Sequence, residues 1–251
     1  MDGSPKGVDW VPPAAEPARR VLVPPGPGGA GGARLYLLAP GDQDGTAEIR
    51  MIGKEGTFTP AGAESVQLTG DRVASVDVGK PARGEPVAIQ IDSSVPVVAA
   101  VRAARGTAGK TPDLGYLAGT RPLANGAVIA DSRTGKGEAA RVYLTAPAAE
   151  ARATVSTVAS GEAGGEPSSV DVVVPAGTTA ALTLKPPAGA STYAVVVTPQ
   201  DGSGPLYGSW AQFAAAGGGE MFTTLALVDD RATVVVPRVG HDLSAGISRS
   251  G

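Results

Sequence analysis

The stretch Ala33-Arg-Leu-Tyr-Leu-Leu-Ala-Pro40 returns, with small changes, as Ala140-Arg-Val-Tyr-Leu-Thr-Ala-Pro147. The two copies lie 107 residues apart (140 − 33). The same spacing places Val21-Leu22-Val23 on Val128-Ile129-Ala130, so the register extends upstream without a gap. A repeat of this length corresponds to a whole domain rather than to one turn of a solenoid. Residues that both copies share are therefore expected to serve the fold rather than catalysis.

Each copy is predicted to consist of short strands separated by turns. Val87, Ile89 and Ile91 occupy every second position, which is the period of a half-buried strand. The 36 Gly and 22 Pro residues favour turns over long helices. The sequence therefore predicts an all-β protein made of two tandem, Ig-like β-sandwich domains related by the internal repeat, with a C-terminal β-hairpin.

The predicted hairpin rests on two apolar runs, Leu225–Val228 and Thr233–Val236, with Asp229-Asp230 as the turn between them. The exact domain boundary around the repeated hairpins is left open, because each hairpin could complete the sheet of the preceding body. The predicted parts are residues 18–106 (first sandwich), 107–124 (connector), 125–212 (second sandwich), 213–240 (hairpin packed on the second domain) and 241–251 (tail).

Composition narrows the function classes. A net charge of −3 and only 4% aromatic residues argue against a nucleic-acid partner. The absence of cysteine from the sequence excludes disulfides and thiolate chemistry, and no apolar run is long enough for a transmembrane segment. The first residues lack the plan of a signal segment, so the alternatives are a cytoplasmic protein or a chain without its leader.

Three stretches of the sequence partly match motifs for phosphate binding, calcium binding and hydrolase catalysis. Ala104–Thr111 is similar to a phosphate-binding loop, but Pro112 follows at once and disfavours the helix that such a loop needs. Asp42-Gln-Asp44-Gly45 lacks the distal ligands of a calcium loop and predicts a hairpin turn. His241 is the sole histidine and falls in the predicted tail, away from any hydrolase motif. We predict no cofactor, no metal site and no catalytic residue.

Two aromatic residues are the candidate ligand-binding residues. Tyr207 and Trp210 flank Gly208 and have no aromatic counterpart in the first copy. They could form a flat platform for a sugar ring or a partner protein. The alternative is that Trp210 fills the core of the second sandwich, since large aromatic side chains are mostly buried.

The repeated opening, the turn at Val174-Pro-Ala-Gly-Thr178 and the strand Val95-Pro-Val-Val-Ala-Ala-Val101 resemble an uncharacterised family of secreted actinobacterial proteins with tandem sandwich units. The resemblance implies export to the cell envelope and supplies no catalytic residue. We therefore expect a non-enzymatic extracellular or cell-envelope interaction protein with a protein or glycan partner at the cell surface. The alternatives are a carbohydrate or cell-wall glycan binding module and a glycoside hydrolase with dispersed carboxylates.

Overall fold

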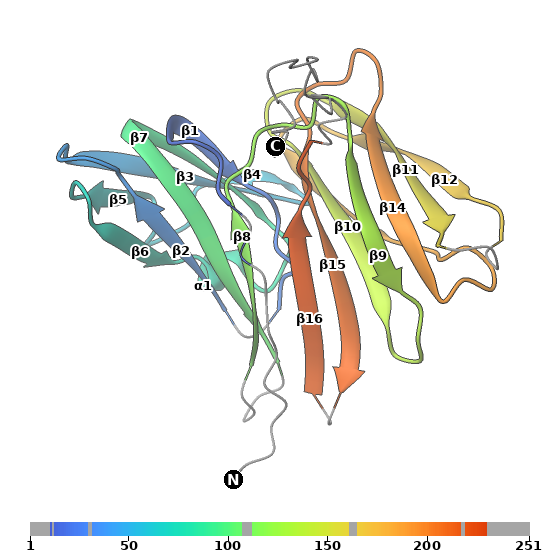
Figure 1. Cartoon of the computed structure of the whole chain (residues 1–251). Helices are drawn as coiled ribbons and strands as arrows, with labels where there is room; N and C mark the ends of the chain where they lie inside the picture. Colours follow the sequence, from blue (N-terminus) through green and yellow to red (C-terminus); the bar gives the residue numbers. More distant parts are fainter. Residues whose placement is uncertain are drawn as a thin grey trace, which may run out of the picture.

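The computed structural model describes residues 11, 13–29, 32–106, 112–160, 165–216 and 219–229. Two β-sandwiches stand side by side in this part of the chain (Figure 1). All strand pairings are antiparallel, and the helical turn α1 (Gly79–Ala82) interrupts the strands of the first sandwich. The prediction of an all-β sandwich protein is confirmed.

The first sandwich has two sheets that share one strand. Sheet I consists of β4, β3, β1, β5 and the first half of β7, and sheet II consists of β6, β2, β8 and the second half of β7. The strands are β1 (Ala18–Val23), β2 (Ala33–Leu38), β3 (Gly45–Gly53), β4 (Gly56–Phe58), β5 (Ser65–Leu68), β6 (Val73–Asp77), β7 (Ala88–Arg105) and β8 (Asp113–Ala118).

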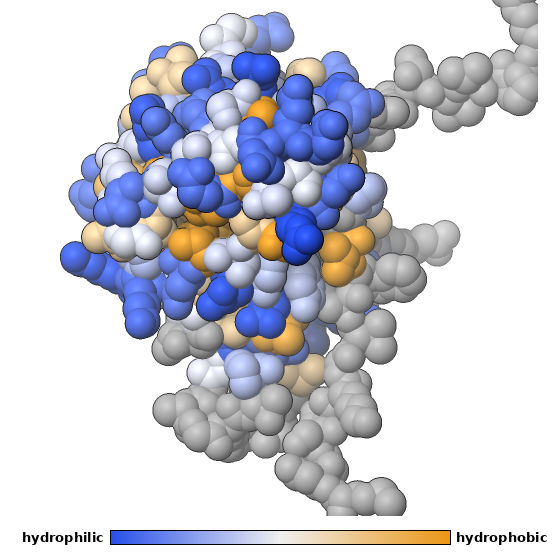
Figure 2. Space-filling model, turned by 90° about the vertical axis from the view of Figure 1, so that its left-hand side faces the viewer, coloured by the Kyte–Doolittle hydropathy of each residue, from blue (hydrophilic) through white to orange (hydrophobic). Residues whose placement is uncertain are grey.

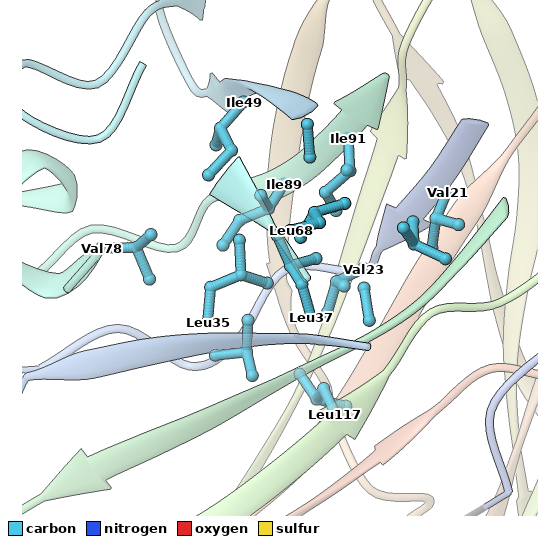
Figure 3. Packing of buried hydrophobic residues seen from close by; sticks show 14 of the residues in the cluster. Val21, Val23, Leu35, Leu37, Ile49, Leu68, Val78, Ile89, Ile91 and Leu117 are labelled. Carbon is cyan, nitrogen blue, oxygen red and sulfur yellow. The ribbon is translucent and has the colours of Figure 1, made fainter. Parts of the chain in front are cut away.

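Aliphatic side chains from both sheets form the core of this sandwich (Figure 3). Ile89 and Ile91 of β7 are buried, whereas Gln90 between them is half-buried on the outer face. The predicted burial of the two isoleucines is therefore confirmed, whereas Gln90, which the alternation predicts to be solvated, is partly covered. The surface on this side of the molecule is mainly hydrophilic, and its apolar residues form small, separated patches (Figure 2).

The second sandwich repeats the pairing scheme of the first. Sheet III has the order β12-β11-β14-β9, and sheet IV has the order β13-β10-β15-β16. Tyr36 and Tyr143 lie at corresponding places, each on the central strand between the same two kinds of neighbour. The strands are β9 (Ala127–Arg133), β10 (Ala139–Ala146), β11 (Ala151–Ala159), β12 (Ser168–Val174), β13 (Thr178–Thr183), β14 (Thr192–Pro199), β15 (Tyr207–Ala216) and β16 (Gly219–Ala226).

The predicted connector over residues 107–124 is wrong in part, because β8 lies within it and pairs with β7. Its glycines suggested a linker. Gly115 instead makes room for a neighbour: a Cβ atom there would lie 2.6 Å from Cε2 of Phe222 in β16. The aromatic ring therefore packs where a side chain would otherwise stand.

The predicted boundary between residues 212 and 213 also differs from the structure. β15 continues through the boundary to Ala216, and β16 returns along it from Gly219. Leu225 and Ala226, from the first strand of the predicted hairpin, pair with Trp210 and Ser209 of β15. Asp230 of the predicted turn lies outside the described residues. The second predicted strand, Thr233–Val236, and the tail 241–251 lie outside the described residues.

The two sandwiches meet where the β7–β8 hairpin lies beside the β15–β16 hairpin (Figure 1). Arg105 at the end of β7 places its guanidinium 4.8 Å from the ring centre of Phe213. The backbone N–H of Phe222 donates to Asp113 Oδ2 at 2.8 Å. The outer face of sheet IV is therefore covered by the first sandwich and is not a free surface there.

Candidate binding site

The two predicted ligand-binding residues lie on the same strand but on opposite faces of sheet IV. Successive residues of a strand alternate between faces, so Tyr207 and Trp210, three positions apart, cannot share one face. Trp210 is 3% exposed and belongs to the core of the second sandwich. The two rings therefore do not form one exposed platform, and Trp210 occupies the core position of the alternative interpretation.

Tyr207 lies at the joint between the sandwiches. Its half-buried side chain packs against Leu22, Ile52 and Ala88 on the outer face of sheet I. Burial raises the pKa of the Tyr207 phenol, and the positive charge of Arg20 partly opposes this effect. Tyr207 thus packs on apolar residues of the first sandwich and lies within the electrostatic influence of Arg20.

Hydroxyl side chains fix the two sandwiches to each other at this joint. Thr179 Oγ1 donates to the backbone carbonyl of Ile52 at 2.7 Å, and both groups are buried. Ser209 Oγ donates to the backbone carbonyl of Pro25. Buried polar groups that are hydrogen-bonded in this way stabilise one relative position of the two sandwiches, because any shift would leave them without partners. Tyr207 is therefore held at a defined place relative to sheet I.

Five polar side chains lie on the outer face of sheet I, the face against which Tyr207 packs, and we name this group the polar corner: Arg20, Glu48, Arg50, Gln90 and Asp92. Strand register places Asp92 of β7 opposite both Glu48 of β3 and Arg20 of β1. The same register places Gln90 opposite Arg50. The five side chains come from three neighbouring strands and form two adjacent rows. The hydroxyl residues of the shallow depression at the outer end of the corner are Thr46, Ser93 and Ser94.

Asp92 is the most strongly held member of the polar corner. Arg20 Nε donates to Asp92 Oδ1 at 2.6 Å, and Gln90 Nε2 donates to Asp92 Oδ2 at 2.8 Å. Partial burial alone would raise the pKa of Asp92. The hydrogen bonds from Arg20 and Gln90, with the charges of Arg20 and Arg50, outweigh it and hold this pKa below its usual value. Asp92 therefore remains a carboxylate with both oxygens bonded.

Glu48 and Asp92 are two carboxylates directly opposite each other on neighbouring strands, an arrangement to compare with the carboxylate pair of a glycoside hydrolase. Residues directly opposite in an antiparallel pair have Cβ atoms about 4.5–5.5 Å apart. A general acid for glycoside hydrolysis requires a carboxyl group with a raised pKa. The pKa of Asp92 is held below its usual value. The direction of the Asp92 pKa shift is therefore opposite to the one that a general acid requires.

The motif over Ala104–Thr111 does not continue as a phosphate-binding loop. Ala104 and Arg105 belong to β7, and β8 begins at Asp113 where such a loop would need a helix. Lys110 lies outside the described residues, as does His241.

The predicted hairpin turn at Asp42–Gly45 is wrong, because the strands on either side of it, β2 of sheet II and β3 of sheet I, do not pair with each other. The segment connects the two sheets of the first sandwich. Asp44 Oδ1 accepts the backbone N–H of Gly70 at 3.0 Å, and Asp71 Oδ1 accepts that of Gly41 at 2.7 Å. Within the described ranges, no group of three or more His, Cys, Asp or Glu side chains is placed to hold a metal ion. These carboxylates therefore stabilise the backbone of this connection.

Asp229 has a role that the sequence did not reveal. Its Oδ1 accepts the backbone N–H groups of Ala124, Asn125 and Gly126 at 2.9, 2.8 and 3.1 Å, and its Oδ2 accepts Asn125 Nδ2 at 3.2 Å. Partial burial would raise the pKa of Asp229, but these hydrogen bonds lower it below its usual value. The carboxylate ties the chain after β16 to the start of the second sandwich. Residues so far apart in sequence carry no local signal of this contact.

The polar corner was also missed, although part of its signal is local. Glu48 and Arg50 stand between buried residues of β3, so alternation places both on the outer face. Their position beside Asp92 and Arg20 depends on cross-strand register, which the sequence does not specify.

These features define an all-β protein of two packed sandwiches, with a cluster of charged and polar side chains on sheet I near their joint. The chain belongs to a family of unknown function, DUF5719, whose model matches residues 1–185. No curated protein matches the chain. The crystal structure of Thermotoga maritima 1070 is similar at 18% identity and a TM-score of 0.34, over 41% of this chain and 93% of that chain. A likeness this low carries no argument. Across the described residues, none of the helical structure is long and apolar enough to cross a membrane.

Proposed function

We propose that this chain is a non-enzymatic interaction protein, secreted or held in the cell envelope of an actinobacterium, that binds its partner through the polar corner and Tyr207. The observation that carries the proposal is the fixed arrangement of Arg20, Gln90 and Asp92 beside the joint. The resemblance of the repeated strands to secreted actinobacterial proteins supports the location.

Preorganisation supports binding at this surface. Asp92 orients the guanidinium of Arg20 and the amide of Gln90, so these groups need little reordering when a ligand arrives. Glu48 and Arg50 are exposed on the same face and add one charge of each sign. This surface combines fixed hydrogen-bond donors and acceptors with positive and negative charges. Such a surface favours a polar ligand that is uncharged or weakly charged.

A glycan is the ligand class that we propose for this surface. Sugar hydroxyl groups both donate and accept hydrogen bonds, and carboxylate, amide and guanidinium groups satisfy them in pairs. The half-buried ring of Tyr207 adds an apolar surface beside these groups, against which a sugar ring can pack. A cell-wall glycan meets both requirements, and a protein partner at the cell surface is the rival.

Sedimentation with insoluble peptidoglycan, and with cellulose for comparison, tests the proposal. We expect Arg20→Ala and Asp92→Asn each to weaken binding about tenfold, which corresponds to the loss of one charge-assisted hydrogen bond. The matched control is Arg152→Ala, because Arg152 forms a similarly exposed ion pair with Glu150 on the second sandwich. If the unaltered protein stays in solution with both polymers, or if the control weakens binding equally, the glycan proposal fails.

A further inference from the structure

The strand β12 is an edge strand of sheet III, and among the strands that the structure describes none pairs with its outer side. It pairs with β11 through seven consecutive residues, Ser168 to Val174, without a register shift. Val170 and Val173 are 46% and 54% exposed. A margin of this kind presents unpaired backbone N–H and C=O groups to another strand. It therefore has the geometry that strand addition requires.

Other edge strands in the described part of the chain have features that disfavour pairing with a further strand. The register of β1 and of β9 shifts within the strand, and β5 and β6 contain only four and five residues. β8 and β16 lie against each other, and β13 contacts β3 and β4 of the first sandwich. Short, bulged or covered margins are the usual protection against unwanted pairing. β12 has no bulge, proline or lysine of this kind.

The side chains of β12 are complementary to a second copy of the same strand. Val170, Val172 and Val174 share the inner face, since their partners on β11 include the buried Val155 and Ala153. If two copies run antiparallel with Val172 opposite Val172, each Val170 stands opposite Val174. Pairs of β-branched residues directly opposite each other stabilise a sheet. The inner face would then be a continuous row of valines.

The same register, with Val172 opposite Val172, brings no like charges directly opposite each other on the outer face of β12. Asp171 would stand opposite Val173 of the other copy and not opposite its own counterpart. Its carboxylate already accepts hydrogen bonds from Thr154 Oγ1 at 2.7 Å and from Gln200 Nε2 at 2.9 Å. These bonds disperse the negative charge near the two-fold axis.

We propose that β12 pairs antiparallel with β12 of a second copy of this chain, centred on Val172, so that two sheets III join into one continuous sheet. The dimer is independent of the polar corner, which lies on the first sandwich. A protein that does not bind glycan could therefore still dimerise through β12, and a protein that does not dimerise could still bind glycan.

Single cysteines test the register, because the natural sequence contains none. In this register Val172→Cys places two thiols directly opposite, within the Cα separation that a disulfide needs, whereas Val173→Cys does not. We expect Val172→Cys to oxidise to a covalent dimer on a non-reducing gel and Val173→Cys to remain largely monomeric. Random collision would favour the more exposed residue 173. Equal or faster cross-linking of Val173→Cys, or no dimer from Val172→Cys, would overturn the proposal.

Sedimentation velocity of the unaltered protein over a concentration series is the second measurement. We expect a monomer–dimer equilibrium that Val172→Lys weakens at least tenfold, because two ammonium groups would face each other at the axis. Val128→Lys, on the opposite margin of the same sheet, is the matched control and should leave the equilibrium unchanged. Melting temperatures show whether both variants are folded. A wild-type protein that is monomeric throughout the series contradicts the proposal.

Discussion

The two sandwiches use the same strand pairings but build one of their strands differently. In the first sandwich, β7 is a single 18-residue strand that belongs to both sheets. In the second, β14 and β15 divide this task and are separated by residues 200–206. The break adds local contacts: Gln200 N–H donates to the carbonyl of Arg152, and the N–H of Arg152 donates to Ser203 Oγ. The comparison teaches that pairing partners define this fold, whereas strand continuity can change.

The cores of the two sandwiches differ at one corresponding position. Val101 pairs with Leu35 in sheet II, and Trp210 pairs with Val142 in sheet IV. Trp210 fills the second core, while Val101 lines a narrow apolar cavity in the first. At this position the second core is thus filled by one large side chain, and the first core by a small one.

Replacing Trp210 should have the largest effect among single substitutions. We expect Trp210→Ala to lower the free energy of unfolding by about 3–5 kcal/mol, because it leaves a large cavity in a closed core. Val101→Ala should cost less, about 1–2 kcal/mol, since it removes two methyl groups beside existing space. Urea denaturation of both variants measures the difference. Equal losses would mean that the two cores are packed alike.

The alternation along β7 gives a second test within one sandwich. Ile89→Ala should cost about 2–5 kcal/mol, because the side chain is buried in the first core. For Gln90→Ala the sequence alone predicts a change within about 0.5 kcal/mol, and the bond to Asp92 raises the expected loss to about 1 kcal/mol. Thermal unfolding of the two variants compares these losses. Similar losses at both positions would contradict the assignment of faces in β7.

Asp229 tests how the end of the second sandwich is held. Asp229→Ala should cost about 1–3 kcal/mol at neutral pH, because three backbone N–H groups lose a charged acceptor. The folded-state pKa is below the unfolded one, so the stabilisation is present above the unfolded pKa and is lost as the pH falls through the folded pKa. Stability curves of wild type and variant should therefore converge in acid.

The exposed turn residue Asp201 is the control for this experiment. Asp201→Ala should follow the wild-type pH profile. If the difference in the free energy of unfolding between wild type and Asp229→Ala stays the same in strong acid, the role of the carboxylate is contradicted.

Arg20 should have the smallest effect on stability. Its side chain is 77% exposed, and exposed ion pairs contribute little. We expect Arg20→Ala to change the free energy of unfolding by at most about 1 kcal/mol, as measured by urea denaturation. The same variant should bind the glycan about tenfold more weakly, which would separate recognition from folding. A large destabilisation would instead make Arg20 a structural residue.

The sequence predicted those parts of the molecule whose signal is local. Alternating residues such as Ile89 and Ile91 identified strands, and the repeat identified two bodies with the same pairing. β8 was missed because Gly115 looks like a linker residue, and only Phe222, packed against it from another strand, explains why glycine stands there. The opposite faces of Tyr207 and Trp210 could have been predicted from their odd spacing. The polar corner could not, because it depends on which strands become neighbours.

The continuity of β7 also bears on the order of folding. Its first half pairs with β1 and β3 and its second half with β2 and β8, so neither sheet of the first sandwich can reach its register without constraining the other. Contacts between strands distant in sequence slow folding, because long loops must close first. The first sandwich should therefore form both sheets in one cooperative step, whereas the non-strand link over residues 200–206 between β14 and β15 lets each sheet of the second find its register separately.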